Sequence, residues 1–311
     1  MMDTGNSGHL IRSEVWSSQL KEVLEDELMG QGYVNWMNEF PDGTTFTIPS
    51  IGQAQTDDYT ENSSVQYRAL DTGEFQFTIN KYKSSGNYIT NKAKQDAYYM
   101  NQLVSSFVPK QARAIMETLE TDIMALSGSQ TSANTNSING AEHRFCGSGT
   151  NEVITVADFA KARYALKKAN VPDRNLIAIV DPSVEYQMNT LTNISNISNN
   201  PRWEGIISSG IASGMSFLAN IYGFDVYTSN YLADANETIG GVTTAAGKAN
   251  MFFSADSTVL PFVGAWRQMP QVDSEYNKDK QREEYVTTAR YGVALYRPEN
   301  LVCVLTDTDQ V

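Results

Sequence analysis

The chain has 311 residues, with 36 acidic against 23 basic side chains and a formal net charge of −13. This length suffices for one or two domains with a sizeable core, and the sixteen Tyr and four Trp are typical of a folded protein. The acidic balance argues against a module that grips nucleic-acid phosphates, and against docking on an anionic membrane surface. It is otherwise what an ordinary soluble surface would show.

The two cysteines, Cys146 and Cys303, lie far apart and match no zinc or redox spacing. We expect reduced thiols and therefore a cytoplasmic compartment. No apolar run approaches the ~18 residues of a transmembrane helix. The first residues lack the charged and apolar regions of a signal peptide, so no membrane association is expected.

Residues 1–51 are predicted to form an N-terminal arm. Residues 1–12 are polar and glycine-bearing, as in segments that become ordered only against a partner. Ser13–Met29 has the period of a short amphipathic helix, with Trp16 or its neighbour on the apolar stripe. Thr44–Ile51 has the composition of a short strand interrupted by a proline.

Residues 52–90 carry the most informative β pattern. Apolar and polar residues alternate on both sides of Asp71-Thr72-Gly73, whose glycine suits a tight turn. The pattern predicts a two-stranded hairpin with one apolar face, and two strands alone are marginally stable in water. That face either joins the main sheet or reaches a neighbouring subunit, and the pattern alone leaves both open. Its apolar residues are Val65, Tyr67 and Ala69 before the turn and Phe75, Phe77 and Ile79 after it.

The longest predicted element is a helix from Asn91 to Ser127, whose apolar residues recur every three to five positions. If continuous, it would be roughly 55 Å long at ~1.5 Å per residue. Pro109 removes one amide donor, so we expect a kink there or two helices end to end. Ser127-Gly128 and the polar run that follows it end the helix.

The second half of the chain predicts a compact α/β unit followed by returning β segments. Thr155 and Asp158 have the spacing of a helix N-cap and first turn. Predicted helices are Thr155–Ala169, Asp181–Met188 and Ile211–Asn220, and predicted strands are Leu176–Val180, Phe224–Thr228, Asn250–Ser254, Thr287–Tyr296 and Leu301–Thr306. Predicted loops are 128–151, 190–200 and 240–248, with 273–284 as a charged, solvated connection.

No catalytic or binding constellation stands out. The only histidines are His9 and His143, so no Ser-His-Asp pattern is assembled. His143 and Cys146 would give a metal only two ligands, and no Gly-Lys-Ser/Thr phosphate loop is present. Adjacent carboxylates such as Asp57-Asp58 point to opposite faces of a strand. We therefore predict no enzymatic activity, no metal site and no cofactor.

Two stretches and the order of the parts indicate a family. The stretches are IVDPSVEYQM at Ile179–Met188 and YGVALYRPENLVCVLTD at Tyr291–Asp307. With the polar arm, the long hairpin, the long helix and the α/β unit, the chain resembles the major capsid proteins of tailed bacteriophages, which have the Hong Kong 97-type fold. The resemblance covers essentially the whole chain and implies an α+β fold of that kind.

The resemblance implies a shell subunit that assembles into pentamers and hexamers of an icosahedral head enclosing double-stranded DNA. By resemblance, the parts are an N-terminal arm (1–51), an extended loop lying over a neighbour (52–90), a peripheral domain with the spine helix (91–151 and 255–298) and an axial domain at the capsomer centre (152–254 and 299–311).

The implied partners are further copies of this chain, a separate scaffolding protein, a portal protein and possible decoration proteins. The implied location is the virion, after synthesis in the host cytoplasm, with DNA enclosed but only weakly bound. Expected inter-subunit contacts are Trp16 in the arm, Val65, Tyr67, Phe75, Phe77 and Ile79 in the hairpin, and Asn193 and Ser195 near the capsomer axis.

Some members of this family form cross-links between a Lys and an Asn. Lys81 and Lys83 lie near the base of the predicted hairpin, but no acceptor is evident.

Two alternatives are open at this point. An encapsulin-type shell is similar in fold and would enclose protein cargo instead of DNA. A hydrolase with an α/β domain and an unrecognised acid pair belongs to another class. Particle size separates the classes, because an enzyme of this length elutes as a small oligomer and a shell as a particle of megadaltons.

Overall fold

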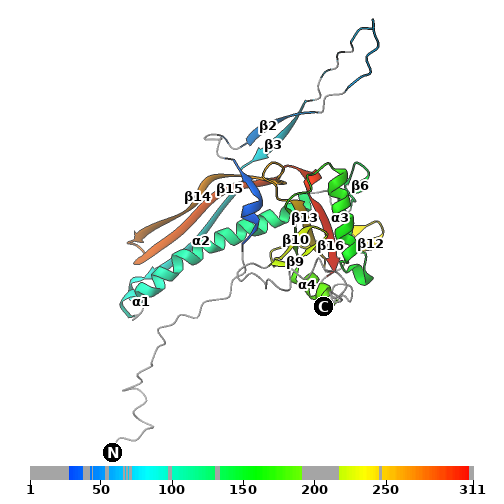
Figure 1. Cartoon of the computed structure of the whole chain (residues 1–311). Coiled ribbons are helices and arrows are strands. Elements are labelled where there is room, and N and C mark those ends of the chain that lie inside the picture. Colours follow the sequence, from blue (N-terminus) through cyan, green and yellow to red (C-terminus); the bar gives the residue numbers. More distant parts are fainter. Residues whose placement is uncertain are drawn as a thin grey trace, which may run out of the picture.

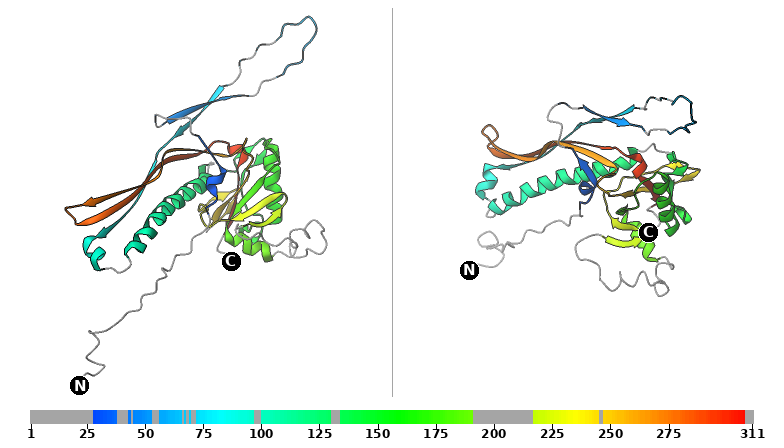
Figure 2. Two further views of the ribbon diagram at one scale, coloured as in Figure 1. Left: turned by 60° about the vertical axis from the view of Figure 1, so that its left-hand side comes forward. Right: turned by 45° about the horizontal axis from the view of Figure 1, so that its top comes forward.

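Two β-sheets organise the chain, one alongside helix α2 and the other at the C-terminal end of that helix (Figure 1). The computed structural model describes residues 28–37, 43, 45–52, 56–65, 67, 69, 72–96, 100–129, 134–190, 217–244 and 247–307. A separate two-stranded ribbon, β2–β3, projects away from both sheets (Figures 1 and 2).

The larger sheet has six strands and is buried on both faces. In spatial order its strands are β7 (Arg144–Cys146), β16 (Val302–Asp307), β13 (Gly247–Ser254), β8 (Leu176–Val180), β10 (Phe224–Thr228) and β9 (Phe217–Ile221). Helix α3 (Val156–Lys168) packs on one face and the last turns of α2 on the other, while α4 (Pro182–Thr190) follows β8. Every residue of β8 is buried, as expected for a central strand between two layers.

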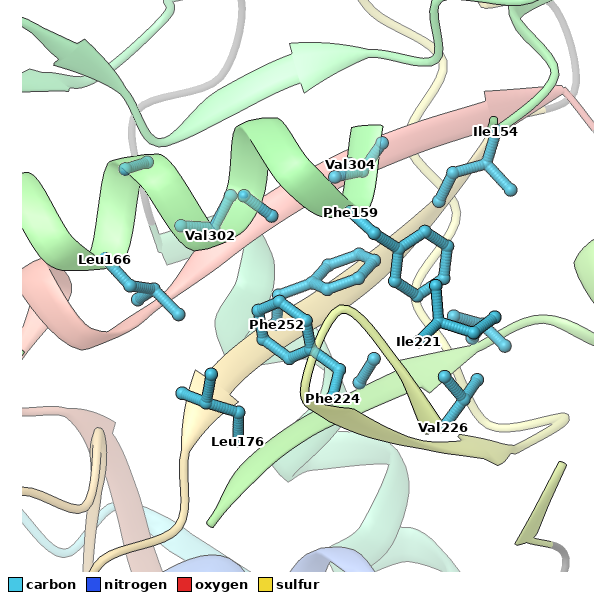
Figure 3. Packing of buried hydrophobic residues seen from close by; sticks show 14 of the residues in the cluster. Ile154, Phe159, Leu166, Leu176, Ile221, Phe224, Val226, Phe252, Val302 and Val304 are labelled. Atoms are coloured by element: carbon cyan, nitrogen blue, oxygen red, sulfur yellow. The ribbon is translucent and has the colours of Figure 1, made fainter. Parts of the chain in front are cut away.

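Three phenylalanines from three elements meet beneath α3 (Figure 3). The ring of Phe252 lies 5.0 Å from that of Phe159 and 5.3 Å from that of Phe224, both edge-to-face. All three side chains are fully buried. Such aromatic pairs contribute about 0.5–1.5 kcal/mol each beyond the area that they bury, so this cluster is a main anchor of the six-stranded sheet.

Helix α3 begins where the sequence predicts. The backbone amide of Thr155 donates to the Asp158 carboxylate at 2.7 Å, completing a capping box. The same carboxylate accepts from the amide of Ser148 at 3.1 Å, which ties the preceding loop to the helix start. The predicted helix Thr155–Ala169 is thereby confirmed.

The smaller sheet has four strands, in the order β1 (Val34–Trp36), β14 (Phe262–Asn277), β15 (Arg282–Leu295) and β4 (Lys81–Thr90). Helix α1 (Asn91–Asp96) follows β4 directly, and α2 (Met100–Met124) runs along one face of this sheet. The Thr287 hydroxyl donates to the Gln111 side chain at 2.9 Å, and the Tyr291 hydroxyl donates to Asp122 at 2.7 Å. These bonds join α2 to β15.

The ribbon pairs β2 (Thr45–Ile51) with β3 (Thr72–Thr78). At its root, Phe46, Phe77 and Ile79 pack on Val263 and Ala265 of β14. A Cβ atom added at Gly292 of β15 would lie 2.8 Å from the carbonyl oxygen of Thr78. The root of the ribbon therefore rests directly on the backbone of the four-stranded sheet.

Short elements complete the fold. They are η1 (Gly30–Tyr33), η2 (Ala125–Ser129), β5 (Ser137–Ile138), β6 (Ala141–Glu142), η3 (Thr150–Glu152), β11 (Thr238–Ile239), β12 (Val242–Thr243) and η5 (Pro298–Asn300).

The predicted hairpin has the wrong partner strand. Phe75 and Phe77 do belong to a strand, but β3 pairs with β2, whereas Val65, Tyr67 and Ala69 lie outside any strand. The turn signal at Asp71-Thr72-Gly73 predicted that β3 pairs with the segment just before it. The strand that does pair with β3 is β2, which lies earlier in the chain, before a longer loop. Pro49 is tolerated because, among the described strands, β2 pairs with β3 alone and is therefore an edge strand.

The long predicted helix does not end at Pro109. Because Pro109 lies inside α2, the expectation of two helices end to end is wrong there, and the alternative expectation of a kink stays a prediction. Helix α1 ends at Asp96 and α2 begins at Met100, so the chain between them lies outside the described residues. A single missing amide donor does not end a helix that is held by packing over several turns.

Several predicted loops are strands instead. The connection 273–284 lies in β14, β15 and the turn between them, and 240–248 holds β12 and the start of β13. The loop 128–151 contains β5, β6 and β7. Of the predicted helix at 211–220, residues 217–220 belong to strand β9, and the rest lies outside the described residues, as do 191–200 and the predicted helix over 13–27.

Candidate inter-subunit surfaces

The loop at the end of the ribbon carries large side chains that its own chain leaves exposed. Tyr67 is 95% exposed, and Tyr59 and Val65 are also largely exposed. Figure 2 shows this loop reaching beyond β2 and β3, away from both sheets. Scattered exposed aromatics are ordinary, but several on one projecting loop are typical of a contact surface.

A second exposed surface lies on the four-stranded sheet, on the face away from α2. Alternation along β4 turns Lys81 and Lys83 toward Asp122 of α2, and so turns Tyr82 and Tyr88 to the opposite face. Tyr82 and Tyr88 are 65% and 59% exposed. We call this surface, made of Tyr82, Ser84, Gly86 and Tyr88 on β4 with Val286 on β15, the outer face.

The outer face is flat at its centre and has an aromatic ring toward each end. Gly86 stands opposite Val286 in the β4–β15 register. The Arg282 guanidinium lies 4.3 Å from the centre of the Tyr88 ring, which keeps that ring against the sheet. The outer face therefore leaves two tyrosine rings exposed on either side of a residue without a side chain.

The face toward α2 holds an ionic cluster around Asp122. The Lys81 ammonium lies 3.3 Å from the carboxylate, and that of Lys83 lies 4.0 Å away. Burial and the Asp122 carboxylate raise the pKa of Tyr291, whose hydroxyl therefore remains a donor to that carboxylate. The two lysines considered for cross-linking thus lie beside a carboxylate of their own chain.

The His143–Cys146 segment is held in the fold by contacts of His143 and Arg144. His143 is buried, and its Nδ1 lies 3.1 Å from the carbonyl oxygen of Ala141. Burial lowers the pKa of this imidazole. Arg144 is buried beside Glu237, with a 2.7 Å ion pair, and donates to the carbonyl oxygen of Ser127 at 2.9 Å. These bonds connect β7 to η2, which follows α2, and to the residue that precedes β11.

The described part of the chain contains no group of three or more His, Cys, Asp or Glu side chains placed to hold a metal ion. The thiol of Cys303 is fully buried, which raises its pKa to about 11. No helix among the described residues is long and apolar enough to cross a membrane.

The predicted contact residues have different fates. Phe77 and Ile79 are 1% and 4% exposed and lie in the chain's own core, so the prediction of an uncovered apolar face is wrong for both. Phe75 is half-buried, with its ring 5.1 Å from that of Tyr296. Val65 and Tyr67 are exposed, as a contact would require. Trp16, Asn193 and Ser195 lie outside the described residues.

Sequence reasoning missed Tyr82, Tyr88 and Val286. Tyr82 and Tyr88 are six positions apart, which is an even spacing and places both on one face of a strand. That signal was present, but it is only informative once the other face is known to be covered by α2.

Solved capsid structures of several phages share this fold. Cyanophage Pam1 capsid matches with a TM-score of 0.71 and 14% identity, covering 100% of this chain and 100% of the other. The capsid of cyanophage P-SCSP1u matches with a TM-score of 0.71 and 13% identity, over 97% of this chain and 94% of the other. A structure from Mycobacterium phage Che8 gives 0.69 and 15%, over 96% and 97%. The fold is thus that of phage capsid subunits.

The family model described as phage capsid protein matches residues 71–304, which is more than half of the chain. The chain therefore belongs to the phage capsid protein family and is a shell component of the virion. The resemblance noted in the sequence is confirmed, and the family implies a structural role rather than an enzymatic one. A search of curated proteins found no match.

Proposed function

We propose that this chain is the major capsid protein that builds an icosahedral phage head from its own pentamers and hexamers and encloses double-stranded DNA. The observation that supports this most directly is the projecting ribbon, whose loop exposes Tyr59, Val65 and Tyr67 to solvent. A subunit that functioned alone would gain nothing from such a loop, whereas a shell subunit can bury it on a neighbour.

The ribbon loop of one subunit is proposed to lie on the outer face of the next. The loop brings exposed aromatic side chains, and the outer face offers Tyr82 and Tyr88 around the flat centre at Gly86. This contact would be heterologous, because two different surfaces of the subunit meet in it. Such a contact closes a ring when the rotation from one subunit to the next is a whole fraction of a turn, and a pentamer or a hexamer has this geometry.

The two sheets support the division into domains, with changed boundaries. The four-stranded sheet and α2 would form the peripheral domain with α2 as the spine helix, and the six-stranded sheet would form the axial domain. Strand β7 pairs with β16, so residues 144–146 are proposed to belong to the axial domain. Strand β4 pairs with β15, so residues 81–90 are proposed to belong to the peripheral domain.

Further partners follow from this proposal. A separate scaffolding protein, a portal protein and decoration proteins are proposed to bind the shell, and synthesis is proposed to take place in the host cytoplasm. Asn193 and Ser195 are proposed to lie near the capsomer axis, and Trp16 at a contact of the arm. With 36 acidic against 23 basic residues, the subunit can neutralise few phosphates, so enclosed DNA is bound weakly and without sequence preference.

The test is to replace Tyr67 by Ser and to co-express the variant with the scaffolding protein. Tyr67 is almost fully exposed, so the unassembled subunit should melt as the wild type does. Particles should be lost, or greatly reduced, in sedimentation and electron microscopy. Tyr164→Ser is the matched control, since it makes the same change at an exposed position on α3.

Two outcomes would count against the proposal at different levels. Wild-type protein that yields only discrete dimers would overturn the shell assignment. Wild-type particles together with normal particles from Tyr67→Ser would leave the shell in place and remove the ribbon loop from its contacts.

A further inference from the structure

The carboxylate of Glu120, on α2, is buried and bonded to backbone amides far away in the sequence. Its two oxygens accept from the amide of Gly30 at 2.8 and 2.9 Å, and Oε1 also accepts from the amide of Met29 at 3.2 Å. Glu120 itself is 2% exposed. A carboxylate withdrawn from water is tolerated only with such partners, so the site is specific for this side chain.

Gly30 is required by the same contact. A Cβ atom added there would lie 2.9 Å from one carboxylate oxygen of Glu120 and 3.1 Å from the other. The backbone thus approaches the carboxylate more closely than any other residue type would allow without displacing it. Glu120 and Gly30 together hold the chain at the point where residues 1–27 join the described body.

Downstream of this contact, residues 29–37 reach both sheets. The ring of Tyr33 lies 5.3 Å from that of Phe253, in the six-stranded sheet. The indole of Trp36 stacks on that of Trp266, in the four-stranded sheet, at 5.2 Å. Val34 is buried in the cluster that contains Phe253 and against which Trp266 packs. Strand β1 pairs with the start of β14.

We propose that residues 29–37 form a strap that sets the angle between the two sheets, and that Glu120 is its fastener. One short segment contacts α2, β13 and β14, which belong to the two sheets and the helix between them. Releasing the α2 end frees Tyr33 and Trp36 to move with the strap, so the sheets lose a common tie.

The first measurement is amide hydrogen exchange of the unassembled full chain. Glu120→Gln is nearly isosteric but replaces one acceptor oxygen by an NH2 group, which faces backbone donors. Charge-assisted bonds are the stronger class, so exchange across residues 29–37 should rise about tenfold or more. Glu117→Gln is the matched control, because Glu117 lies on the same helix and pairs with the Arg113 side chain instead.

The second measurement is the distance between a spin label at the tip of the four-stranded sheet and one on α3, which packs on the six-stranded sheet. Labels at Lys278, in the turn between β14 and β15, and at Lys168, at the end of α3, report the angle, with Cys146 replaced by Ser. The wild-type background and Glu117→Gln should give one narrow distance distribution, and Glu120→Gln a broadened one.

Unchanged exchange in Glu120→Gln would overturn the fastener. Faster exchange with an unchanged distance distribution would overturn the link to the angle between the sheets. Both readouts use the subunit before assembly, so neither result depends on the proposed shell function.

Discussion

The six-stranded and four-stranded sheets differ in what covers them. The first lies between α3 and the end of α2, and its central strand β8 is buried along its whole length. The second has α2 on one face, while among the described residues the ribbon root packs on the other face near Val263 and Ala265. The six-stranded sheet therefore completes its own core, whereas the four-stranded sheet leaves Tyr82 and Tyr88 for another surface to cover.

The largest expected effect is in the six-stranded sheet. Phe252→Ala removes the ring that contacts both Phe159 and Phe224, and should cost about 3–5 kcal/mol in the free energy of unfolding. Urea unfolding of the unassembled subunit measures it, with Tyr186→Ala, at an exposed position on α4, as the control. A loss below about 1 kcal/mol would mean that this cluster does not anchor the sheet.

A smaller and more local effect is expected at the ribbon root. Phe77→Ala removes a buried ring from a small cluster and should cost about 3 kcal/mol. Amide exchange should rise in β3 and β4 while β8 and β13 keep their protection. Phe75→Ala, at a half-buried position on the same strand, should cost less.

Equal loss of protection in both sheets would contradict the independence of the two regions. If Phe77→Ala unfolds like the wild type, Phe77 does not stabilise the isolated subunit, and the inter-subunit contact predicted from the sequence would again be the better interpretation of this side chain.

The smallest expected effect depends on pH. The pKa of His143 is lowered in the folded state, chiefly by burial, so the unfolded chain binds a proton first as the pH falls below about 6.5. Stability should then decrease toward acid, by at most about 1.4 kcal/mol per pH unit for one proton. His143→Gln should flatten unfolding free energies measured between pH 7 and 5. His9→Gln, the same change at the other histidine, is the control.

A slope that survives in His143→Gln would assign the acid sensitivity to other groups. The backbone carbonyl of Ala141 and the charge of Glu299 both oppose the burial effect, so the measured slope also reports their sum.

Elements with local signals could be predicted from the sequence. Helix α3 follows its capping box at Thr155 and Asp158, and β8 is a short apolar run between breakers. The strand β10 and the final strand β16 were found for the same reason. These elements lie in the six-stranded sheet, where burial on both faces leaves a clear hydrophobic pattern.

Features that depend on distant partners could not be predicted. The segment around Asp273–Glu284 is charged because both faces of the β14–β15 tip meet solvent, so its strands carry little hydrophobic pattern. The apolar face of β3 is covered by Val263 and Ala265, far along the chain, and no local signal marks that pairing. The outer face required knowledge of where α2 lies. The residues of the outer face could therefore not be predicted from the sequence, and the predicted inter-subunit contacts stay predictions.

The close approach at Gly292 separates two properties of the ribbon. Because the Thr78 carbonyl leaves no room for a side chain there, the direction in which the ribbon leaves the body is set by the sheet beneath its root. Its length is set elsewhere, by the number of residues between β2 and β3. Insertions into residues 56–65 should therefore extend the ribbon without turning it, so they would displace the proposed contact with the neighbouring subunit along the direction of the ribbon.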